Sequence, residues 1–247
     1  MATFLNGSMP GLLDLKMYES GILDVANTEG IDLNDKVVVA RDEIASELLM
    51  FLVERSNIRP KLEQVARTTT LRQWHILHTL EAIYRDAFFN QLNDRYQQKW
   101  QEYQRLVQRA REIAIGSGVG LILNPIPQAG SPVLTAASGT LAPASYFVRM
   151  AWLGLNGAEG EPSDVRAVEL TNNGVLQVTP PAAPAGVAGW NVYVGNSGDQ
   201  LSLQNGRPIA IDTAWTMASA GLVAGSTPGD GQIPDQYLSG QQLVRRG

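Results

Sequence analysis

The only two histidines of the chain lie one helical turn apart. His75 and His78 belong to the run "QWHILH", and Glu81 follows three residues later. On an α-helix this spacing places the three side chains on one face, where two imidazoles and a carboxylate could bind zinc. A zinc site needs a further ligand, and the chain has no cysteine and no HExxH motif. We therefore expect surface or interface histidines, with no bound metal or cofactor.

The glycine-rich run "GSGVG" at residues 116–120 resembles a loop that binds phosphate. Phosphate-binding loops follow a strand and open a helix, because the anion sits at the helix N-terminus. Here the order is reversed, since a helical pattern precedes the run and the apolar "LIL" follows it. The run is therefore predicted to be a hinge, with Gly116 as the C-cap of the preceding helix.

No pattern of nucleophile and base stands out in the sequence. A GxSxG motif is absent, and the histidines lie in a helical segment without an obvious serine partner. The carboxylate pairs Asp42/Glu43 and Glu159/Glu161 flank predicted caps or turns, where acidic side chains are ordinarily solvated. We expect a protein that is not an enzyme and has no catalytic residues.

The charge of the chain bears on its partners. The net charge of −5 argues against a general binder of nucleic acids or of anionic membranes. Arg105, Arg109 and Arg111 are accompanied by Glu102 and Glu112 at helical spacing, which indicates a solvated face. No run of 18 apolar residues and no basic leader is present, so we expect neither a membrane span nor a secretion signal. Synthesis in the cytoplasm is expected.

Composition divides the chain into two parts with different patterns. Residues 1–116 hold 14 of the 19 basic and 16 of the 24 acidic residues, and the remainder contains no lysine. The sequence therefore predicts an α+β protein with four regions. These are a helical bundle domain at 1–116, a linker at 117–127, an immunoglobulin- or fibronectin III-like β-sandwich at 128–225, and an extended C-terminal tail at 226–247.

A long apolar stripe dominates the helical part. One helix is predicted after an N-cap at Asn34 or Asp35, and Pro60 separates it from the next segment. Between Thr70 and Ile115 apolar residues recur at helical spacing, which predicts either one long helix or two helices with a break near Asn90 and Asn93. The stripe consists of Leu77, Leu80, Tyr84, Phe88, Leu92, Tyr96, Trp100, Tyr103, Val107, Ala110 and Ala114.

The second part alternates with a period of two, which is typical of strands. In "SYFVRMAW" and "GWNVYVG" every second residue is apolar, and turn-rich clusters separate the runs. A third run, "RPIAID", alternates in the same way. The alternation places Trp152 and Trp190 in the core of a sandwich, which disfavours a carbohydrate-binding module with exposed aromatic residues. That module is the alternative function from another class.

Both parts resemble proteins of tailed bacteriophages. "GTLAPASYFVRMAWLGLNGAEGEPS", "VRAVEL" and "LQVTPPAAPAGVAGWNVYVGNSGDQLSLQN" are similar to the strands and turns of fibronectin III-like modules on virions. The order of these runs differs from a standard module, which leaves the strand order open. The helical run "YRDAFFNQLNDRYQQKWQEYQRLVQRARE" resembles helical head-to-tail adaptor (connector) proteins.

The resemblance implies a structural role in the neck of the virion. Such adaptors form a ring, typically of twelve subunits, beneath the portal protein, and they extend the channel through which DNA passes without specific binding. They also provide the seat for the tail, nozzle or fibre proteins. The alternative within this class is a protein that attaches the tail or its fibres.

Specific residues follow as predicted interface positions. Tyr96, Trp100, Tyr103 and Val107 are expected to be covered partly by neighbouring helices of the chain and partly by adjacent subunits. Apolar residues of the turn-rich tail are expected to reach a partner, either as an added strand or as anchors in pockets. These residues are Tyr237, Leu238, Leu243 and Val244.

Overall fold

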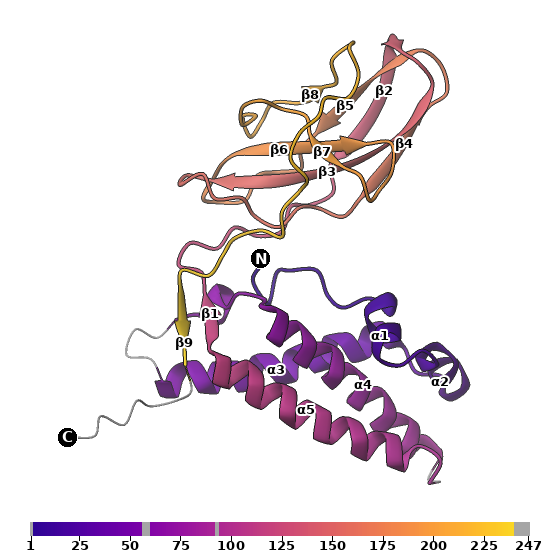
Figure 1. The fold of residues 1–247 in the computed structure, drawn as a ribbon, viewed down its shortest axis with the longest axis vertical. Coiled ribbons are helices and arrows are strands. Elements are labelled where there is room, and N and C mark those ends of the chain that lie inside the picture. Colours follow the sequence, from indigo (N-terminus) through magenta and orange to yellow (C-terminus); the bar gives the residue numbers. More distant parts are fainter. Residues whose placement is uncertain (1, 56–59, 92–93, 240–247) are drawn as a thin grey trace, which may run out of the picture. The chain divides into compact units, whose positions relative to one another are not determined.

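The computed structural model describes residues 2–55, 60–91 and 94–239. The chain forms two compact units, one of helices and one of antiparallel sheets (Figure 1), so the predicted α+β organisation is confirmed. The helical unit comprises Ser8–Leu123 and Pro234–Gly247, and the β unit comprises Met1–Gly7 and Asn124–Ile233. The N-terminal residues thus belong to the β unit, and the chain returns to the helical unit near its C-terminus.

The helical unit contains five α-helices, within the described residues. The predicted stripe runs over two of them, α4 and α5, and the break lies after Gln91, close to the expected position. Residues 92–93, which include Leu92 and Asn93, lie outside the described part. The helices are α1 (Leu12–Tyr18), α2 (Ile22–Glu29), α3 (Leu33–Arg55), α4 (Thr69–Gln91) and α5 (Gln97–Ser117), with a 3-10 turn at Leu62–Gln64.

Two helix ends differ from the predicted caps. Asp32 caps α3, because its Oδ1 accepts a 2.8 Å hydrogen bond from the backbone N–H of Asn34. The C-cap of α5 is Gly118 rather than Gly116. Gly118 has a φ of 100°, a conformation that only glycine adopts without strain.

The core of the helical unit lies around α4, which contacts all four other helices. Its side chains pack against α3 on one side and α5 on another, and α5 contributes Ala110 and Ala114 to the buried set. Small residues at these positions allow the α5 backbone to approach α4 closely. The large buried side chains include Trp74, Leu77, Leu80 and Ile83 of α4 and Ile44, Leu48 and Leu52 of α3.

A two-stranded sheet completes the helical unit. Strand β1 (Val119–Leu121) follows α5 directly and pairs antiparallel with β9 (Gln236–Leu238), with Val119 opposite Leu238 (Figure 1). On its other side Leu121 bridges to Val65. The segment predicted as a linker is therefore partly a buried strand, and the predicted extended tail contributes a strand to the helical unit of its own chain.

The β unit consists of two antiparallel sheets that enclose one core. One sheet has the order β2-β5-β8 and the other has the order β4-β3-β6-β7, which resolves the strand order that the sequence left open. The strands are β2 (Val133–Leu141), β3 (Ala144–Gly154), β4 (Arg166–Leu170), β5 (Gly174–Thr179), β6 (Val187–Gly195), β7 (Ser202–Leu203) and β8 (Trp215–Thr216).

The predicted inward faces of the two central strands are confirmed. Trp152 of β3 lies opposite Trp190 of β6, and both indoles are buried in the core. Tyr146, Val148 and Met150 are buried on the same face of β3. The run "RPIAID" forms no extended strand, and only Ile209 makes an isolated bridge, to Trp190.

Candidate functional site

Tyr96 and Tyr103, two of the predicted interface residues, are buried within the helical unit itself. The Tyr96 hydroxyl donates a 2.9 Å hydrogen bond to Oε1 of Glu29, and the Tyr103 hydroxyl donates a 3.2 Å bond to Oε2 of Glu19. The Tyr103 ring stacks on Tyr84 of α4 at 5.4 Å. Both residues are thus covered by neighbouring helices of the chain, as one part of the prediction had it, and contacts with adjacent subunits stay a prediction.

Tyr84, Tyr96 and Tyr103 form a tyrosine cluster whose environment keeps the hydroxyls protonated. Burial raises the pKa of Tyr84 and of Tyr103 well above the ordinary value, and the nearby charge of Glu19 raises both further. Lys99 also contacts Glu19, at 2.9 Å from Oε2. Glu19 therefore connects the short N-terminal helices to α5 through a phenol and an ammonium group.

Trp100 and Val107 are each only half-buried on α5. The Trp100 indole stacks on Phe88 at 5.3 Å and meets the edge of Phe89 at 5.5 Å. Phe89 is 56% exposed. These three aromatic residues leave part of their ring surface open to a partner, as an interface requires.

The two histidines have different partners. His75 is buried, and its Nε2 lies 2.9 Å from the backbone carbonyl oxygen of Val37. Burial lowers the pKa of His75 to about 4, although the bond to Val37 opposes that shift. His75 is therefore neutral at pH 7 and links α4 to α3.

His78 belongs to a cluster of titratable side chains between α3 and α4. Its Nε2 lies 2.7 Å from Oε2 of Glu43, and Arg85 lies 3.5 Å from Glu43 and 3.6 Å from the buried Glu81. Glu81 also accepts a 2.7 Å hydrogen bond from Nε1 of Trp100. No group of three or more potential ligands is placed to hold a metal ion in the described part of the chain. Through the contacts with Glu43 and Trp100, the cluster joins α4 to both α3 and α5.

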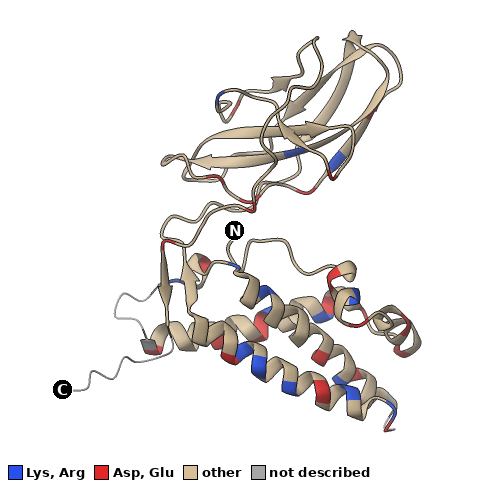
Figure 2. Ribbon diagram, in the orientation of Figure 1, with Lys and Arg blue, Asp and Glu red and all other residues tan. Residues whose placement is uncertain are grey.

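The remaining charged candidates lie on α5 and in the β unit, and Figure 2 marks the charged residues along the ribbon. Arg105 and Arg109 are exposed on α5, whereas Arg111 pairs with Glu47 of α3. In the β unit, Glu159 accepts hydrogen bonds of 2.8 Å from the Tyr193 hydroxyl and 2.6 Å from Nδ2 of Asn191. The expectation that Glu159 is a solvated turn residue is thus wrong, because the turn folds back along β3 and places it beside β6.

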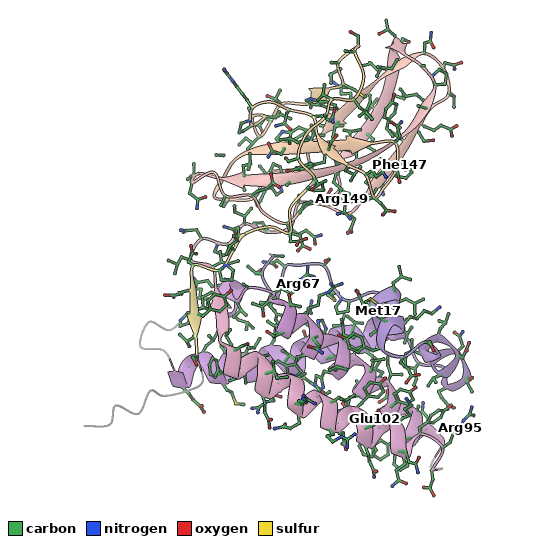
Figure 3. All side chains as sticks on the ribbon, viewed as in Figure 1. Met17, Arg67, Arg95, Glu102, Phe147 and Arg149 are labelled. Carbon is green, nitrogen blue, oxygen red and sulfur yellow. The ribbon has the colours of Figure 1, made fainter. Side chains whose placement is uncertain are left out.

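Apolar side chains that sequence reasoning did not select are exposed on the helical unit. On α1, Leu13 is 80% exposed and Met17 is 82% exposed, and Met17 is labelled in Figure 3. They lie four residues apart and therefore on one face of the helix, while Leu15 faces the core. The spacing of Leu13 and Met17 in the sequence indicates an apolar helix face. It does not indicate whether another part of the chain packs on that face. A second exposed group on α3 consists of Leu49, Met50 and Val53.

The predicted C-terminal anchors are only partly described. Tyr237 lies on β9 with 57% of its surface exposed, and Leu238 is half-buried opposite Val119. Leu243 and Val244 lie outside the described residues. Of the two predicted anchors that the structure describes, Tyr237 has a largely exposed side chain that a partner could contact.

Comparisons of the chain with protein-family models, with proteins of curated function and with solved structures find no match. None of the described helices is both long and apolar enough to cross a lipid bilayer.

Proposed function

We propose that this protein is a structural virion component, a head-to-tail adaptor that assembles into a ring between the portal and the tail of a bacteriophage. In this role the helical unit supplies contacts to neighbouring subunits and to the portal, and the β unit extends from the ring. DNA passes through the channel without specific binding. The resemblance of the sequence to adaptor proteins motivates the proposal, and the exposed apolar side chains of the helical unit support it.

The observation that carries the proposal is the apolar face of α1. Leu13 and Met17 each expose about four-fifths of their surface, and Leu12 and Tyr18 of the same helix are also exposed. Large contiguous apolar surface is typical of interaction sites. Burying a leucine or methionine side chain contributes about 1.5–3 kcal/mol, so a few such residues can drive association.

The titratable residues of the helical unit also favour an assembly role. His75, His78 and Glu81 each contact a neighbouring helix, and their contacts hold α4 in the centre of the bundle. Burial keeps His75 neutral and inward-facing. These are the properties of groups that specify packing, and they support a rigid bundle as the building block of a ring.

Copy number and position in purified virions test the proposal. Quantitative mass spectrometry is expected to find this protein and the portal protein in near-equal copies, and antibody label in electron micrographs is expected at the neck. Label along the tail or fibres would assign the protein to tail or fibre attachment instead. Absence from particles would overturn both assignments.

Substitutions on α1 test the carrying observation directly. Leu13→Asp and Met17→Asp place a charge in the apolar face and are expected to reduce incorporation into particles at least tenfold. Ser20→Asp is the control, because it adds the same charge at an exposed position outside that face. Thermal unfolding of all three variants should match the wild type, since none of these side chains is buried. Normal incorporation of the α1 variants would exclude α1 from assembly.

A further inference from the structure

The β unit has four sheet edges, and one of them differs from the others. Strands β7 and β8, each an outer strand of its sheet, contain only two residues. Strand β4 carries Arg166 and Glu169, which protect an edge against pairing with other chains. Strand β2 is nine residues long and contains no charged residue and no proline. It is the one long and unprotected edge in the described β unit.

The pairing of β2 leaves one side of its backbone open. Among the described strands β2 pairs only with β5, in a continuous register from Val133 opposite Thr179 to Ser138 opposite Gly174 (Figure 1). The register shifts only after Ser138. In an antiparallel sheet every second residue directs its N–H and C=O away from its partner strand. An outer row of donors and acceptors is therefore presented along residues 133–138.

Side chains do not obstruct this edge. All residues from Thr135 to Thr140 are exposed, and they include Ala136, Ala137, Ser138 and Gly139. Leu176, which lies opposite Ala136 on β5, is by contrast fully buried. Exposed strand backbone with small uncharged side chains is a ready template for the addition of another strand.

We propose that β2 pairs antiparallel with β2 of a second copy of this chain, so that two three-stranded sheets join into one continuous six-stranded sheet. The contact has two-fold symmetry, and each residue of one β2 therefore meets a residue of the same neutral strand. This inference concerns the β unit alone and does not depend on the adaptor role. A two-fold contact cannot close a ring by itself, so it adds to the contacts of the helical unit.

Charge favours β2 of a second copy, rather than another surface of its β unit, as the strand that pairs with the open edge of β2. Residues 1–7 and 124–233 contain seven Asp and Glu but only three Arg, so two β units repel each other in general. Like charges directly opposite on paired strands are destabilising. Because β2 carries no charge, two copies can pair there without that cost, whereas pairing through β4 would bring charged residues to the contact.

Disulfide trapping in the full-length protein tests this contact. The chain has no cysteine, so a single introduced cysteine reports only on its own position. Thr135→Cys, Ala136→Cys, Ala137→Cys and Ser138→Cys are made separately and oxidised. The residue at the two-fold axis faces its own copy within the Cα separation of 4.4–6.8 Å that a disulfide spans. We expect at least tenfold more cross-linked dimer from one of these positions than from the control Ala167→Cys, which is exposed on the β4 edge.

A charge substitution provides the second measurement. The wild type is expected to show a dimer in light scattering at high concentration, and Ala137→Lys should shift it to monomer without lowering the thermal midpoint. Ala167→Lys is the matched control and should leave the dimer intact. A monomeric wild type, equal cross-linking at Ala167→Cys, or dimer loss by both lysine variants would overturn the proposal. A strand captured from a different protein would overturn the choice of a second copy as occupant.

Discussion

The indole Nε1 of Trp100 donates a 2.7 Å hydrogen bond to Oε1 of Glu81, 19 residues earlier in the chain. The bond runs from α5 to α4 and gives the buried Glu81 side chain a donor. Glu81 also lies next to His78 and Arg85 of its own helix. Among the described residues, Oε2 of Glu81 is buried without a hydrogen-bond partner, so the bond from Trp100 to Oε1 is the one that satisfies this side chain.

Trp100→Phe should therefore destabilise the helical unit. Phenylalanine retains an aromatic ring against Phe88 but removes the donor to Glu81, which leaves a buried acceptor unsatisfied at a cost of about 1–3 kcal/mol. Urea denaturation would measure the change in the free energy of unfolding. In a Glu81→Leu background the same substitution should cost clearly less, and an equal cost in both backgrounds would show that the bond contributes nothing.

The stability of the helical unit should depend on pH through His75. Its pKa is about 4 when folded and 6.5 in the unfolded chain, so between these values the unfolded state binds more protons. The contribution of His75 to the free energy of unfolding is therefore complete above pH 6.5. It decreases by about 3 kcal/mol as the pH falls towards 4.

The contribution of His75 is separable from that of the carboxylates, which also titrate in acid. His75→Gln retains a side-chain donor towards the carbonyl of Val37 but does not titrate. The difference in unfolding free energy between wild type and variant should shrink or reverse from pH 7 to pH 4.5. A difference that is constant over this range would contradict the lowered pKa of His75.

Truncation should separate strand β9 from the residues beyond it. Deleting residues 240–247 leaves β9 in place and is expected to keep the thermal midpoint of the helical unit. Deleting residues 234–247 removes the partner of β1 and uncovers Val119 and Leu121, which are buried. That deletion should lower the midpoint by several degrees, as followed by circular dichroism at 222 nm. Equal midpoints for the two truncations would show that β9 does not stabilise the unit.

Two glycines on either side of the α5 C-cap should respond oppositely to the same substitution. A Cβ at Gly120 would lie 2.9 Å from Cγ of Pro234, whereas a Cβ at Gly116 meets nothing within 4 Å. Gly120→Ala should weaken the β1–β9 pair, and Gly116→Ala should be neutral or stabilise α5 by up to about 1 kcal/mol.

Amide hydrogen exchange would follow the β1–β9 pair at Asp235, whose N–H donates a 2.8 Å bond to the carbonyl of Leu121. Faster exchange in Gly120→Ala but not in Gly116→Ala is the expected result. Unchanged exchange in both variants would contradict the close approach of Pro234 to β1.

Sequence periodicity alone determined the class of each half and the buried faces of its main elements. The period of two in β3 and β6 identified Trp152 and Trp190 as core residues, because alternate side chains of a strand point to opposite faces. The helical spacing from Leu77 to Ala114 identified one continuous apolar stripe for the same kind of reason. These patterns are local, since they follow from backbone geometry and the burial of one face.

Only the tertiary structure decided what covers each face. The stripe at Tyr96 and Tyr103 needed a cover, and the hairpin of α4 and α5 supplied it from within the chain, with Glu19 and Glu29 as partners from distant helices. Likewise, nothing local to residues 236–238 indicated that they would pair with β1, more than a hundred residues away. A periodic pattern reports that a side chain avoids water. Which surface excludes the water depends on contacts between segments that are far apart in the chain, and these contacts leave no local period in the sequence.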